Sequence, residues 1–309
     1  MKKIFLFSLV LVISLVSCKK KTIEEEDDHT HTAPRLIFKF KFDSTQVRLN
    51  DSGQVSLLPS NHGAQCPKFN KMSAHYIEIS GDFDSVGKGK VLYRAPEVTT
   101  GGSLAIDFNQ SVRVGDGQEF FSIPLSQVSA GIYKWLRVSV AYQNYDIVYK
   151  NTVIPSGFGT GTIASFIGFN TYITSYTIKN QSQAINANKL QGYWGFETTV
   201  LGTSYVSTGQ APPGATTVPN PNLANSPIPA GSCLVTGQFK AANGANAPLI
   251  IQGTEEHDII VTVSLSTNNS FEWVEHGGDS YFEPVNATNP LVQDTVVDMG
   301  IRGMVPKWE

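Results

Sequence analysis

The sequence predicts an all-β fold, an antiparallel β-sandwich of immunoglobulin-like or jelly-roll-like type, on three observations. Short segments alternate between apolar and polar residues, as strands do when one face is buried and the other is wet. Clusters of Gly, Asn, Asp and Pro separate these segments and supply turns at regular intervals. Charged residues make up 16% of the chain, below the roughly 25% typical of globular proteins, as in many extracellular β proteins.

The segment 36–42 gives the clearest strand, because its even-numbered residues are all apolar while Lys39 and Lys41 point the other way. Further strands are expected at 103–108, 132–142, 171–178, 258–265 and 271–275. No segment carries a sustained 3.6-residue apolar period with capping residues, and 181–190 is the best helix candidate.

Two glycine-rich segments resemble nucleotide-binding loops but lack their spacing. In 81–89, five residues separate the glycines, and Gly89 stands where a phosphate loop has its metal-binding hydroxyl. This segment is therefore expected to be a hairpin turn. In 157–161, the strand-to-helix context of a dinucleotide fingerprint is missing.

The first 17 residues predict a signal peptide. A basic start at Lys2 and Lys3 precedes an apolar run of about 13 residues, too short to span a bilayer core that needs ~20. The run ends in Leu-Val-Ser before Cys18, and this ending resembles a bacterial lipobox. The resemblance implies cleavage before Cys18 and acylation of its thiol, with membrane lipid as the partner; an ordinary signal peptide is the alternative.

Residues 18–34 are expected to form a flexible, acidic, lipidated tether. Three lysines are followed by five consecutive acidic residues, and a segment so rich in charge cannot bury enough apolar surface to fold. A lysine followed by acidic residues also resembles the surface-export signal of Bacteroidota lipoproteins. The expected location is therefore the outer membrane, at the cell surface, or alternatively facing the periplasm.

Residues 35–309 are expected to form the β-rich soluble domain, with a subdivision into two packed halves near residue 150 as an alternative. After lipidation of Cys18, the remaining pair Cys66 and Cys233 forms one disulfide or stays reduced in an oxidising compartment. The net charge of −3 gives no sign of a basic patch, so nucleic acid is not an expected partner.

Candidate metal ligands are the histidines at 29, 31, 62 and 75, because imidazoles near carboxylates or a thiol bind copper or zinc. His62 precedes Cys66 by four residues, and Asp82 and Asp84 are spaced like the start of a calcium loop. No His-Glu-x-x-His or paired Cys-x-x-Cys motif is present, and the Asp82 segment lacks the other ligands of an EF-hand. No cofactor is therefore predicted, with copper or calcium as the alternative.

The chain shows no motif for nucleophilic catalysis, since it lacks a Gly-x-Ser-x-Gly elbow. Carboxylates at 255, 256, 258, 272 and 275 gather near the end but are expected on the wet faces of strands. Aromatic residues concentrate in the middle of the chain, and exposed rings bind sugars or peptides at low entropic cost. Tyr145, Tyr193 and Trp194 are the candidate binding residues.

Three segments carry a resemblance to a known family: 74–79, 138–147 and 297–304. They resemble an uncharacterised lipoprotein family of marine and gliding Bacteroidota, over most of residues 35–309. Residues 35–145 also resemble the methanobactin-associated periplasmic copper-binding proteins, through a Phe-x-Phe opening strand and a Gly-x-Tyr turn at Gly131. None of that family's metal ligands falls on this chain by position.

Together these features predict a membrane-anchored, non-enzymatic β-sandwich lipoprotein that binds a glycan or a protein ligand. The alternative is a periplasmic protein that binds copper or calcium.

Overall fold

The predicted all-β architecture is confirmed by the computed structural model, which describes residues 33–49, 54–83, 87–211, 227–229, 231–285 and 289–309. Ala33–Glu309 form one compact unit. The predicted signal peptide, Cys18, His29 and His31 lie outside the described residues.

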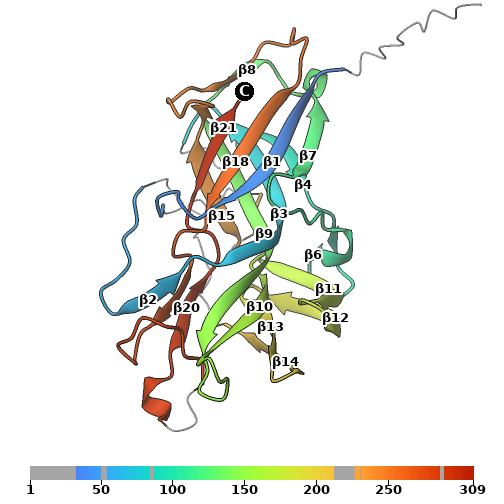
Figure 1. Cartoon of the computed structure of the whole chain (residues 1–309). Coiled ribbons are helices and arrows are strands. Elements are labelled where there is room, and N and C mark those ends of the chain that lie inside the picture. The colour runs from blue at the N-terminus through green and yellow to red at the C-terminus, as the bar shows by residue number, and fades with distance from the viewer. Residues whose placement is uncertain (1–32, 50–53, 84–86, 212–226, 230, 286–288) are drawn as a thin grey trace, which may run out of the picture. The chain divides into compact units, whose positions relative to one another are not determined.

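The first sheet brings together strands from both ends of the sequence. Figure 1 shows β1 (blue), β18 (orange) and β21 (red) side by side. β1 pairs parallel with β18 and antiparallel with β7, so this sheet is mixed rather than purely antiparallel. In order, its strands are β16 (Lys240–Ala241), β21 (Met304–Trp308), β18 (Ile259–Ser266), β1 (Arg35–Asp43) and β7 (Glu119–Pro124).

The second sheet is built around two long strands, β3 and β9. One edge of β9 pairs with β3 along most of its length, and the other edge changes partner, from β15 at 135–140 to β10 at 142–150. The strands are, in order, β14 (Thr203–Gln210), β13 (Tyr193–Val200), β10 (Phe158–Phe166), β9 (Trp135–Lys150), β3 (Lys68–Ser80) and β4 (Lys90–Arg94), with β15 (Cys233–Gln238) beside β9.

Smaller sheets and three short 3-10 helices complete the described fold. One sheet contains β12 (Ser182–Leu190), β11 (Asn170–Thr177), β6 (Ala105–Asp107) and β5 (Glu97–Val98). The others contain β17 (Leu249–Ile251) and β8 (Gly131–Tyr133), and β2 (His62–Gln65), β19 (Phe271–Val274) and β20 (Thr295–Met299). The helices are η1 (Phe108–Gln110), η2 (Leu125–Gln127) and η3 (Pro290–Val292).

The core lies between the first two sheets. The alternating residues of β1 point Phe38 and Phe40 inward, with no exposed surface, against apolar side chains of β3 and β9. Residues 72–80 and 136–145 of these two strands are buried on both faces, because smaller sheets and loops cover the face turned away from the main core. The alternation of buried and exposed residues that is expected for strands with one solvent-facing side is therefore absent at the centre of the molecule.

Two alternatives raised by the sequence differ from what the structure shows. The helix candidate at 181–190 is strand β12, because pairing with β11 along its whole length outweighs the local preference of its Ala, Gln and Lys residues. The subdivision near residue 150 falls on the connection between β9 and β10, which pair antiparallel and belong to one sheet.

The glycine-rich segment 81–89 connects the antiparallel strands β3 and β4, which confirms the predicted hairpin. Glu78, fully buried, accepts hydrogen bonds from the backbone N–H groups of Gly87 (2.8 Å) and Gly89 (3.2 Å). Arg137, also fully buried, pairs with the same carboxylate at 3.1 Å. The turn is thus held by a buried ion pair, which explains its composition without a phosphate ligand.

No disulfide joins Cys66 to Cys233. Cys233 pairs with Val140, whereas Lys68, two residues after Cys66, pairs with Asp146. Their partners on β9, Val140 and Asp146, are six residues apart, which is about 20 Å at roughly 3.3 Å per residue. A disulfide needs Cα atoms within about 7 Å.

Candidate functional site

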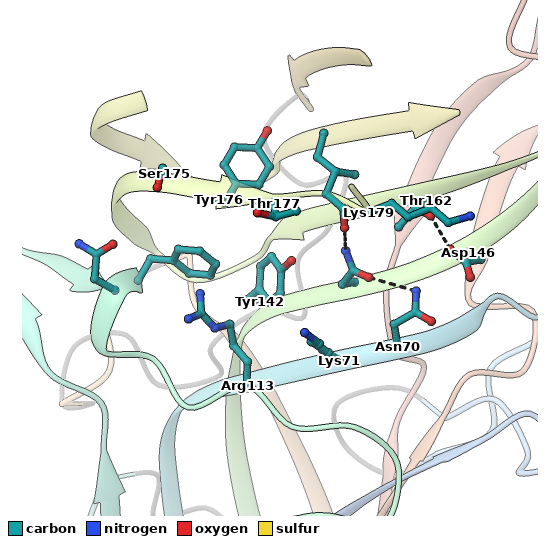
Figure 2. Close-up of a pocket in the computed structure, with 14 residues that line it drawn as sticks. Asn70, Lys71, Arg113, Tyr142, Asp146, Thr162, Ser175, Tyr176, Thr177 and Lys179 are labelled. Atoms are coloured by element: carbon teal, nitrogen blue, oxygen red, sulfur yellow. Dashed lines mark hydrogen bonds between the residues drawn. The ribbon is translucent and has the colours of Figure 1, made fainter. Parts of the chain in front are cut away.

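A polar cleft of about 640 Å³ opens between β11 on one side and β3 and β9 on the other (Figure 2). Its volume falls in the range of roughly 300–1,000 Å³ usual for ligand sites. Amide, hydroxyl and charged side chains predominate, over three aromatic rings. The lining residues are Asn70, Lys71, Phe108, Asn109, Arg113, Tyr142, Asn144, Asp146, Thr162, Ser175, Tyr176, Thr177, Ile178 and Lys179.

Asparagine side chains tie the walls of this cleft together. Asn70 of β3 donates to the side-chain oxygen of Asn144 at 3.0 Å, and Asn144 donates to the Ile178 carbonyl at 2.8 Å. On the other side, Asn109 of η1 donates to the Thr174 hydroxyl at 2.7 Å. Since these bonds link β3, β9, η1 and β11, the cleft is preorganised by the fold.

The turn that carries Lys179 is anchored by a buried carboxylate. Glu197 of β13 is 2% exposed, and it accepts hydrogen bonds from the backbone N–H groups of Lys179, Asn180 and Gln181 at 2.8, 2.9 and 2.9 Å. Burial alone raises the pKa of Glu197, but these three bonds outweigh it and leave that pKa below its ordinary value. Glu197 therefore stays ionised and fixes the turn at the edge of the cleft.

Arg113 and Lys71 reach the cleft from two other elements. The Arg113 guanidinium carbon lies 4.4 Å from the centre of the Phe108 ring, a stacking contact that fixes the side chain. Lys71 follows a bulge in β3 between Phe69 and Lys71, and such bulges re-aim side chains. Both cations are exposed.

The aromatic floor of the cleft is neutral. Phe108, Tyr142 and Tyr176 are 3–4% exposed, and burial raises the pKa of Tyr142 to about 12. Its hydroxyl therefore stays protonated near neutral pH and can donate a hydrogen bond.

The candidate binding aromatics do not lie in this cleft. Tyr145 has no exposed surface and packs 4.9 Å from the Phe69 ring, and Tyr193 is 5% exposed among Phe166 and Tyr176. The prediction is wrong for these two tyrosines, because the sheets bury the face on which a ligand would stack. Trp194 is half-buried and packs against the main core.

The described candidate metal ligands each have a glutamate partner. His62 Nδ1 lies 2.5 Å from Glu272 Oε1, and the fully buried His75 has its Nε2 2.8 Å from Glu97 Oε1. Within the described ranges, no three His, Cys, Asp or Glu side chains gather closely enough to hold a metal ion. Copper or calcium binding stays a prediction.

A second concentration of charge is centred on Glu272, which is 4% exposed on β19. Its carboxylate accepts from Arg48 at 2.9 Å, from Arg302 at 2.6 Å and from His62. Burial raises its pKa, but the bonds from His62 and Arg48 and the charge of Arg302 leave that pKa below the ordinary value. Arg302 also pairs with Asp298, whose pKa burial raises to about 6. This network joins distant segments in the interior.

The other late carboxylates mostly hold local structure. Glu255 accepts from the Gln252 and Gly253 backbone, Asp258 from the Arg35 backbone, and Glu275 from the Trp273 indole. These contacts account for the carboxylates without a catalytic role.

The cleft residues were missed from the sequence because no local pattern marks them. Along the chain, Arg113 follows Lys71 by 42 residues, and Lys179 follows Arg113 by 66 residues. Only the pairing of β3, β9 and β11 with their neighbours brings them to one place.

None of the helices among the described residues has the length and apolar character needed to cross a bilayer. No protein-family model, curated protein or solved structure matches this chain.

Proposed function

We propose that the protein is a lipid-anchored, surface-displayed lipoprotein of a Bacteroidota type, whose β domain binds an oligosaccharide in the cleft between β11 and β9. Anchoring is proposed from the lipobox-like ending at Cys18 and the charged residues that follow it. Binding is proposed from the cleft itself.

The observation that carries the binding proposal is the combination of amides and hydroxyls above buried aromatic rings. Asn70, Asn109, Ser175 and Thr177 line the cleft and offer both donors and acceptors to sugar hydroxyls. The rings beneath, such as Tyr142, are almost fully buried, so they support the polar residues of the lining and the ligand contacts come from the amides and hydroxyls. A peptide ligand would call for deep apolar side-chain pockets, whereas this cleft is open and most of its lining residues carry polar or charged side chains.

Anchoring is tested on the full chain in a bacterial host that lipidates exported proteins. We expect radiolabelled palmitate to enter the wild type and not the Cys18→Ser variant, and protease added to intact cells to remove the wild-type domain. An unlabelled wild type, or a Cys18→Ser variant that fractionates unchanged, contradicts the anchoring.

Binding is tested with the lipidated chain, purified in detergent, on an array of defined oligosaccharides. Each hydrogen bond contributes roughly 0.5–1.5 kcal/mol, so we expect the double variant Ser175→Ala/Thr177→Val to bind about 10-fold more weakly. The matched control, Ser207→Ala/Thr208→Val, changes exposed residues of β14 outside the cleft and should bind as the wild type does. An array without any bound saccharide contradicts the proposal.

A further inference from the structure

Three cations surround the cleft, and they come from three separate elements. Lys71 lies on β3, Arg113 follows η1, and Lys179 lies in the turn between β11 and β12. Figure 2 shows Arg113 and Lys71 on the β3 side and Lys179 on the opposite side. Asp146 is the one acidic residue of the lining, so three positive charges face one negative charge, in a protein whose net charge is −3.

The single carboxylate does not neutralise these cations. Asp146 accepts a hydrogen bond from the Thr162 hydroxyl at 2.5 Å. In Figure 2 both residues stand at the end of the cleft opposite Arg113. Glu197 accepts from three backbone N–H groups, and its negative charge also interacts with the charge of Lys179. Lys71 and Arg113, which pair with no carboxylate of the described residues, therefore leave positive charge in the cleft for a ligand.

Arg113 differs from the other arginines of the chain. Arg35, Arg48, Arg94, Arg137 and Arg302 each donate a hydrogen bond to an oxygen atom of the protein. The Arg113 guanidinium lies over the Phe108 ring, and no protein oxygen of the described residues accepts from it. Its planar donors are therefore available at the cleft to bind carboxylate or sulfate groups.

We propose that the cleft binds an acidic oligosaccharide, with carboxylate or sulfate groups against Lys71, Arg113 and Lys179 and sugar hydroxyls against the amides of Asn70 and Asn109. This inference rests on the proposed saccharide-binding function and adds the chemical class of the ligand. Anions in a cleft lined by one sign of charge gain both affinity and association rate.

The test compares four oligosaccharide probes of equal length by calorimetric titration of the lipidated chain in detergent. They are tetragalacturonate, its methyl ester, a sulfated chondroitin tetrasaccharide and a neutral cellotetraose. We expect at least one acidic probe to bind 10-fold or more tightly than both neutral probes, and the comparison of uronate with sulfate identifies the anionic group. Binding of the acidic probe should weaken as salt is raised from 20 to 300 mM, concentrations chosen so that the Debye length falls from roughly 20 to 6 Å.

Variants locate the contacts. Charged hydrogen bonds in partly exposed sites lose a factor of about 3–10 when the charge is removed. We expect that loss for Lys71→Gln and Lys179→Gln, and about 10-fold for Arg113→Gln. Lys134→Gln is the matched control, because Lys134 is exposed and outside the cleft lining. Circular dichroism checks that each variant is folded.

The outcomes separate this inference from the function on which it rests. Equal binding of neutral and acidic probes overturns the inference and leaves saccharide binding intact, whereas no binding of any probe overturns both. If the three cleft variants bind the acidic probe as tightly as the wild type, the inference is overturned, because the anion then binds elsewhere. If an oligothymidylate binds as tightly as the acidic saccharide, the inference is also overturned, because the cleft then selects charge and not a saccharide.

Discussion

The variant Glu272→Gln tests the buried charge network. Glu272 holds Arg48, Arg302 and His62 on segments that are far apart in sequence. The glutamine keeps the shape of the side chain and removes its charge. Two guanidinium groups then remain at a site where the Arg48 side chain is only 6% exposed, and a buried cation without its counter-charge is strongly unfavourable.

The expected loss of unfolding free energy is about 3 kcal/mol. Removing one partner of a buried ion pair costs roughly 3–5 kcal/mol. The lower value applies because Arg302 is 21% exposed and keeps contact with Asp298 and with solvent. For a domain of this size, about 3 kcal/mol lowers the Tm by roughly 6–10 °C.

The loss also depends on pH with a defined sign. Because the pKa of Glu272 is lowered by folding from an ordinary value of 4.5, its stabilisation is complete above that value and disappears as the pH falls through the lowered one. The difference between wild type and variant is therefore full at pH 7 and shrinks under acid.

Urea denaturation of both proteins, followed by tryptophan fluorescence between pH 3 and 7, measures this difference. Glu256→Gln is the matched control, because Glu256 is exposed, and it should stay within about 0.5 kcal/mol of the wild type. A loss below about 1 kcal/mol at pH 7, or a loss independent of pH, would refute the reasoning.

Three further predictions concern Asp298, Tyr145 and the two cysteines. Folding raises the pKa of Asp298 from 3.8 to about 6, so the contribution of Asp298 to stability falls as the pH rises between these values. In urea titrations, Asp298→Asn should reduce this fall in unfolding free energy by about 1–2 kcal/mol. An unchanged dependence of unfolding free energy on pH contradicts the prediction. The Tyr145 hydroxyl is buried with no hydrogen-bond partner among the described residues, so Tyr145→Phe should be neutral or stabilise by about 1 kcal/mol, and a lower Tm argues against this. Because no disulfide joins Cys66 to Cys233, a reducing agent should leave the Tm and the gel mobility unchanged; a shift in either would indicate a bond.

The sequence predicted the strands whose two faces differ. The segment 36–42 alternates strictly and is strand β1, with its even-numbered residues inward. The strand expected at 258–265 is β18, within one residue at each end. The local pattern agrees with the final burial along β1 and in the first half of β18, where inward residues are buried and the others are partly open.

The sequence did not predict the centre of the molecule or the cleft. β12 carries helix-favouring residues, and only its pairing with β11 makes it a strand. The aromatic residues chosen as binding candidates were judged by side-chain type, and the burial of Tyr145 depends on contacts with Phe69 and Phe271. The cleft cations are separated in sequence, so their proximity is a property of sheet topology.

The parallel pairing of β1 with β18 has a consequence for the order of events after synthesis. β1 begins at Arg35, and its partner begins at Ile259, so about four-fifths of the chain must be made before the first strand can pair on that side. Until then the phenylalanine-rich edge of β1 is open to other chains. The first sheet can therefore be completed only after the last segments of the chain have been made. A chain cut short before β18 would aggregate rather than fold in part.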